Sequence, residues 1–91
     1  MLSGMRSPYF LAVRDVVNKV DPVGLLALGA PGDEYDAEVE ELVRWQQPAT
    51  PGAVAEVFLR WFGAGAGELT ADQAERIAVG IDTARREHRS V

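Results

Sequence analysis

The sequence predicts an all-α protein, a small irregular four-helix bundle with one additional short helical turn. Four segments carry apolar residues at the three- and four-residue spacing of an amphipathic helix, and none alternates as a strand does. A residue that commonly caps helices, Ser, Thr or Asp, stands immediately before each segment. The chain of 91 residues is long enough for one core, so we expect a single domain over residues 7–91 behind a disordered tail of residues 1–6.

The first helix is predicted from Pro8 to Val20. Ser7 can cap it, and proline suits the first helical position because the N–H it lacks would have no partner there. Its apolar positions share one face, which we expect to be buried: Tyr9, Val13, Val16, Val17 and Val20.

A short helical turn is predicted directly after this helix. Asp21 is placed to cap a turn that begins at Pro22. Gly29 can end the turn in a left-handed conformation, and Pro31 prevents the helix from resuming.

Asp36 is the predicted cap of the second helix, which ends before Gln47-Pro48. We expect Val39, Leu42 and Val43 to face the core.

The third helix begins with the pair Thr50-Pro51 and runs through Phe62. It is apolar on most of its circumference, which is typical of a central, buried helix; an exposed half that forms a homodimer through Trp61 and Phe62 is the alternative. Residues 63–67 form a glycine-rich break.

The last helix is predicted from a capping box, with Thr70 as cap and Gln73 three residues later. The side chains that we expect it to bury are Ala74, Ile77, Ala78, Ile81 and Ala84.

One stretch resembles a known family. Its residues are Asp21-Pro22-Val23-Gly24-Leu25-Leu26, Gly29-Ala30-Pro31, Asp33-Glu34-Tyr35-Asp36 and Val39. This run is similar to the signature of the YugE-like family, a group of small bacterial proteins classed as a domain of unknown function. The similarity is close over residues 21–43, and Gly32 and Ala37 depart from the pattern. The resemblance implies an all-helical fold and carries no catalytic residues.

Composition argues against several classes of function. The net charge of −5 disfavours a nucleic-acid binder, and the lack of cysteine excludes thiolate metal sites and thiol nucleophiles. No apolar run approaches the roughly 20 residues that span a bilayer, and no secretion signal is present, so we expect a cytoplasmic protein. The only histidine, His88, lies near the C-terminus. We therefore predict no catalytic residue, no metal ligand and no cofactor.

Residues 33–41 hold six carboxylates and no basic residue. We interpret this segment as an acidic docking face for a basic protein partner, because long-range attraction would speed association. Two aromatic residues, Tyr35 within the segment and Trp45 after it, would supply apolar anchorage; a place at the edge of the core is the alternative for both. The predicted partner-binding residues are Asp33, Glu34, Tyr35, Asp36, Glu38, Glu41 and Trp45, with Glu40 adding charge.

The predicted function is a non-catalytic protein-interaction module, such as an inhibitor or immunity-type partner of a basic protein, or an adaptor. A divalent-metal or small-molecule binding protein that uses the same carboxylates is an alternative, although Glu38 stands where a calcium loop needs glycine. A solvated helix start explains the acidic residues without any ligand. The sequence leaves a monomer and a structural homodimer open.

Overall fold

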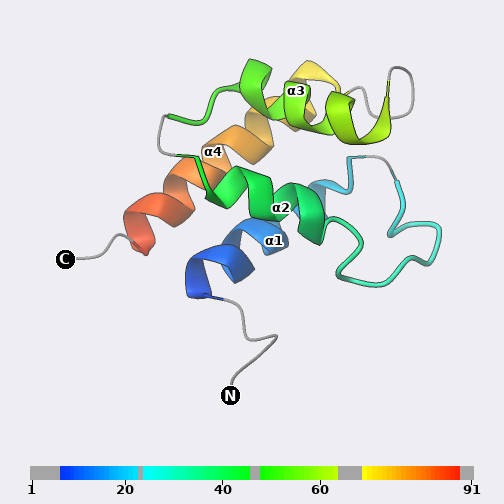
Figure 1. Ribbon diagram of the computed structural model, residues 1–91, viewed down its shortest axis with the longest axis horizontal. Helices are drawn as coiled ribbons and strands as arrows, with labels where there is room; N and C mark the ends of the chain where they lie inside the picture. Colours follow the sequence, from blue (N-terminus) through cyan, green and yellow to red (C-terminus); the bar gives the residue numbers. More distant parts are fainter. Residues whose placement is uncertain (1–6, 23, 46–47, 64–68, 89–91) are drawn as a thin grey trace.

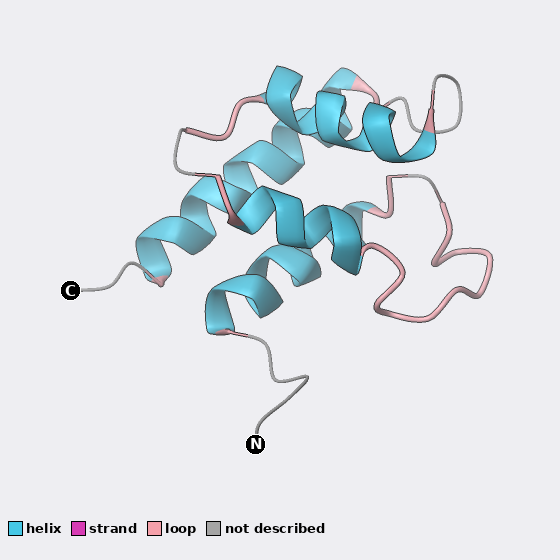
Figure 2. Cartoon of the chain, viewed as in Figure 1, coloured by secondary structure: helices cyan, strands magenta, loops and turns pink. Residues whose placement is uncertain are grey.

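The computed structural model describes residues 7–22, 24–45, 48–63 and 69–88. Four helices form in these ranges, and no strand does: α1 (Pro8–Val20), α2 (Asp36–Val43), α3 (Pro51–Phe62) and α4 (Ala71–Glu87) (Figure 2). The prediction of an all-α four-helix protein is confirmed. The predicted tail of residues 1–6 and most of the glycine-rich break lie outside the described residues.

Three of the helix starts are capped as the sequence predicts. The Ser7 hydroxyl accepts a hydrogen bond from the Phe10 N–H at 3.0 Å, and the Thr50 hydroxyl accepts one from the Ala53 N–H at 3.2 Å. At α4 the capping box is complete, because Thr70 and Gln73 each bond the backbone N–H of the other at 3.0 Å. Local chemistry therefore sets these boundaries.

The start of α2 differs from the prediction. Tyr35, not Asp36, is its N-cap residue and makes no capping bond with its side chain, and the helix ends at Val43. Asp36 is the first helical residue, and its carboxylate bonds α1 instead. The Asp36 carboxylate therefore bonds Arg14 of α1 and does not cap the start of its own helix.

The helices pack as a ring in which α1 contacts α2, α2 contacts α3, α3 contacts α4, and α4 returns to α1 (Figure 1). Between them lies one core. All the predicted inner residues of α4 are buried. Of the predicted inner face of α1, Val13 and Val17 are buried, and Phe10, which the sequence analysis did not place inside, is buried with them.

The third helix is not buried on all sides. Val54, Val57 and Phe58 face the core, whereas Leu59 and Trp61 are exposed. The main helix contacts of α3 in the described ranges are with its ring neighbours α2 and α4, and its outer face is exposed. The expectation of a central, fully buried helix was wrong.

None of the helices in the described ranges has both the length and the hydropathy needed to cross a membrane.

Candidate functional site

The loop between α1 and α2, residues 21–35, projects beyond the helices at the right of Figure 1 and is organised by Asp21. Asp21 ends α1 in a left-handed conformation, with φ at 50°, and its N–H bonds the Val17 carbonyl at 2.8 Å. Its carboxylate accepts bonds from the N–H groups of Leu26 and Ala27, both at 3.0 Å, and from the Tyr35 hydroxyl at 2.7 Å. Asp21 therefore caps a turn before Gly29, as predicted, but the N–H groups that its carboxylate accepts belong to the turn Leu25–Leu28 and not to one that starts at Pro22.

That turn, Leu25–Leu28, closes as a helix end does. The Gly29 N–H bonds the Leu26 carbonyl at 3.0 Å, and the Ala30 N–H bonds the Leu25 carbonyl at 3.0 Å. Gly29 has φ at 99°, which glycine adopts without strain. The predicted left-handed Gly29 is confirmed.

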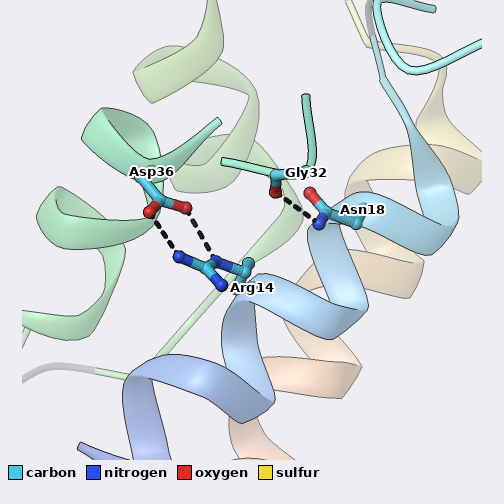
Figure 3. A network of polar contacts seen from close by, with 4 residues as sticks. All are labelled: Arg14, Asn18, Gly32 and Asp36. Atoms are coloured by element: carbon cyan, nitrogen blue, oxygen red, sulfur yellow. Dashed lines mark hydrogen bonds and ion pairs between the residues drawn. The ribbon is translucent and has the colours of Figure 1, made fainter. Parts of the chain in front are cut away.

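Two further contacts tie the far side of the loop to α1 (Figure 3). The Arg14 guanidinium donates to both Asp36 oxygens, at 2.9 and 2.6 Å, and the Asn18 amide donates to the Gly32 carbonyl at 2.8 Å. A bidentate pair of this kind fixes orientation as well as distance. The loop is therefore held at both ends and along its length.

Burial by itself would raise the pKa of the Asp21 carboxyl. The hydrogen bonds from the Tyr35 hydroxyl and from the backbone N–H groups of Leu26 and Ala27 outweigh it and bring that pKa below its ordinary value. The native loop thus favours the charged form of Asp21.

Tyr35 is fully buried, so its predicted role as an exposed anchor was wrong. Its ring meets those of Phe58 and Phe62 edge-on, with centroids 6.2 Å apart, and its hydroxyl is bonded to Asp21. An aromatic ring with a polar tip suits this place between the core and the loop.

Three of the predicted docking carboxylates are not available as free charges. Glu38 is buried, with 4% of its surface exposed. Asp36 is paired with Arg14, and Glu41 accepts hydrogen bonds from Arg60 and from the Trp61 indole, the latter at 3.0 Å. Glu40 forms an exposed ion pair with Arg44 at 3.4 Å. The chain's own arginines therefore neutralise much of the predicted acidic face.

The Glu41 contacts shift its ionisation. Desolvation acts to raise the pKa of this carboxyl, but the hydrogen bonds from Trp61 and Arg60 prevail, and the pKa lies below its ordinary value. Because the Trp61 N–H is used in this way and Phe62 is partly buried against Phe58, the two residues proposed for a homodimer also serve the fold.

Asp33 and Glu34 are exposed, and neither carboxylate makes a hydrogen bond or ion pair with a residue in the described part of the chain; Asp33 acts on Arg14, and Glu34 on Glu38, only through space. Trp45 is partly buried and lines a hollow with Tyr9, Arg85 and His88 beyond the other end of α2. The length of α2 separates it from the two free carboxylates. The predicted docking residues therefore do not form one surface.

The tip of the loop was not among the predicted docking residues. Leu28 is 83% exposed, and Ala27, Gly29 and Pro31 beside it are exposed too. Leu25 and Leu26 turn inward and pack against the core. Nothing local in the sequence marked Leu28 as exposed, because Leu25 and Leu28 are three positions apart and such residues share a face in a helical turn.

No group of three or more acidic or histidine side chains in the described ranges is arranged as metal ligands would be. His88 is exposed at the end of α4.

Comparison with known proteins adds no relative: no family model, no curated protein and no solved structure matches this chain. The similarity to the YugE-like family stays a prediction.

Proposed function

We propose that this protein is a non-catalytic protein-binding module that docks through the tip of the α1–α2 loop, residues 25–34. The observation that carries the proposal is the 83% exposed Leu28, held on a loop whose shape is fixed by Asp21, Tyr35 and Asn18. A single exposed leucine is ordinary on a protein surface, but here hydrogen bonds from side chains to the loop backbone and between Tyr35 and Asp21 hold the loop that carries it.

A braced loop is a suitable contact surface for two reasons. Its conformation is already ordered, so less entropy is lost on binding than with a free segment. Burying a leucine side chain stabilises a folded protein or a complex by about 1.5–3 kcal/mol. Because Leu28 is exposed in this chain, a partner that covers it would gain that free energy on binding.

The charges beside the tip indicate the chemistry of the partner. The carboxylates of Asp33 and Glu34 are exposed and make no hydrogen bond or ion pair within the described chain, and they follow the tip in the same loop. A complementary protein would offer an apolar pocket for Leu28 and lysine or arginine side chains at its rim. An inhibitor or immunity-type partner of a basic protein would use such a surface, and so would an adaptor.

The test is capture of partners from a native lysate on immobilised protein at low and moderate salt, with proteins identified by mass spectrometry. Wild-type protein should retain a basic protein that Leu28→Ser loses. Val79→Ser is the matched control, because Val79 is 56% exposed on α4, away from the loop, and this variant should retain the same protein.

The double variant Asp33→Asn, Glu34→Gln should bind more weakly at low salt and show a smaller salt dependence than wild type. If Leu28→Ser retains what wild type retains, or if no basic protein is captured at all, the loop is not a docking surface.

A further inference from the structure

Glu38 is the only buried charged residue in the described part of the molecule. It stands in the first turn of α2, with 4% of its surface exposed. Its Oε1 atom is inaccessible and has no hydrogen-bond partner among the residues that the structure describes. Buried carboxylates are normally paired or bonded, so this orphan oxygen needs a physical explanation.

Within the described ranges, no cationic group acts on Glu38. The charged groups that act on it are three carboxylates: Glu34 from the loop, and Asp36 and Glu41 from α2. The arginines that α1 and α3 direct toward α2 are occupied, since Arg14 bonds Asp36 and Arg60 bonds Glu41. An ionised Glu38 would be desolvated, partly unbonded and repelled by its neighbours.

We propose that Glu38 is a proton-binding site: the native fold holds it as a neutral carboxylic acid, and loss of this proton loosens the packing of α2 against the core. A neutral acid can occupy the same space at much lower cost, because no net charge is removed from water. Val39 and Leu42 lie on the same buried side of α2, so water drawn toward an ionised Glu38 would disturb their packing.

The direction of the ionisation shift agrees with this geometry. Desolvation raises the pKa of the Glu38 carboxyl, its own backbone N–H opposes the rise, and Glu34, Asp36 and Glu41 add to it. Below the ordinary value of 4.5 both folded and unfolded chains hold the proton. As the pH rises above it, the unfolded chain releases its proton first, so the free energy of unfolding falls until folded Glu38 ionises as well.

The test compares wild type with Glu38→Gln by urea denaturation at a series of pH values from acid to neutral. Relative to the variant, wild type should lose up to about tenfold in folding equilibrium constant per pH unit between the two pKa values of Glu38. Glu56→Gln, an exposed carboxylate on α3, is the matched control and should keep the wild-type profile.

The readout is how the difference in unfolding free energy between wild type and Glu38→Gln changes with pH. The size of that difference at one pH is not the readout, because an amide can fit the site poorly at every pH and lower the variant's stability throughout. A difference that does not change with pH overturns the proposal. As an independent measurement, the ¹³C shift of the Glu38 side-chain carboxyl in native protein should move at a higher pH than in an unfolded peptide. Titration at or below the pH of the peptide also overturns the proposal.

Discussion

At the scale of single residues, Asp21 and Tyr35 act together. The Tyr35 hydroxyl donates to Asp21 and accepts from the Leu25 N–H at 3.3 Å. The Asp21 carboxylate accepts from the next two N–H groups of the turn, those of Leu26 and Ala27. Three consecutive N–H groups are thus satisfied by two side chains that lie fourteen positions apart. Asp21 and Gly29 could be recognised as special from sequence, whereas the Tyr35 partner could not, because nothing local brings position 35 to position 21.

Tyr35→Phe should lower the free energy of unfolding by about 1–3 kcal/mol, because it leaves the Leu25 N–H without its acceptor and removes a donor from Asp21. The ring contacts with Phe58 and Phe62 are retained, so the fold should persist. Urea denaturation measures the loss, and amide hydrogen exchange at Leu25 should become faster. Unchanged stability and exchange would mean that the hydroxyl does not hold the loop.

Gly29→Ala should cost about 1–2 kcal/mol, because the backbone at Gly29 is left-handed and an L side chain is strained there. A Cβ at this position meets no atom within 4 Å, so the cost is purely conformational. Gly32→Ala is the control: the added methyl is equally unobstructed and φ is not positive. Its unfolding free energy should stay level or rise slightly, and equal losses in both variants would contradict the explanation.

At the scale of helices, the contact between α1 and α4 depends on the absence of a side chain. A Cβ at Gly80 would lie 2.5 Å from a Val16 methyl carbon, so the two helices approach as closely as they do only with glycine there. The sequence predicted both helices and their inner faces, but a glycine inside a helical pattern gives no indication of which helix it will face. The crossing is therefore a tertiary result.

Gly80→Ala should destabilise the protein by about 1–3 kcal/mol despite the better helix propensity of alanine, since it overpacks the crossing. Gly52→Ala in α3 is the control, because its Cβ meets nothing within 4 Å, and it should gain about 0.5–1 kcal/mol. Adding Val16→Ala to Gly80→Ala should recover part of the loss, so that the two effects are not additive in thermal or urea denaturation. Additive losses would show that Val16 is not the obstacle.

At the scale of the whole molecule, charge is distributed differently from what the sequence suggests. The net charge of −5 and the run of acids in residues 33–41 indicated one acidic face. In the folded chain, Arg14, Arg44 and Arg60 each pair with a carboxylate of α2. Arg14 and Arg60 lie more than fifteen positions from their partners, so the pattern of charge along the chain did not reveal them.

Stability should fall in acid, because the pKa values of Asp21 and Glu41 are lowered in the native state. Their contribution is present above the ordinary values of 3.8 and 4.5, and it is lost as the pH falls through the lowered native values. Glu41→Gln should cost about 0.5–1 kcal/mol at neutral pH, a modest amount because solvent screens this partly exposed pair. The difference from wild type should shrink at pH 3 in urea denaturation; a constant difference would contradict the assignment.

The sequence by itself determined the elements of this protein: its all-helical class, the start of three helices at their caps, and the inner face of α4. These features depend on residues within a few positions of one another, so the local pattern contains the information. Only the tertiary structure decided which side chains reach solvent. Tyr35 and Glu38 look exposed in an acidic segment, yet both are buried. Tyr35 bonds Asp21 and packs against Phe58 and Phe62, and Glu38 is covered by the surrounding side chains. Leu28 is apolar and would be expected in the core, yet its side chain is exposed to solvent. Exposure depends on neighbours that are distant in the chain, and the folded arrangement alone assigns those neighbours.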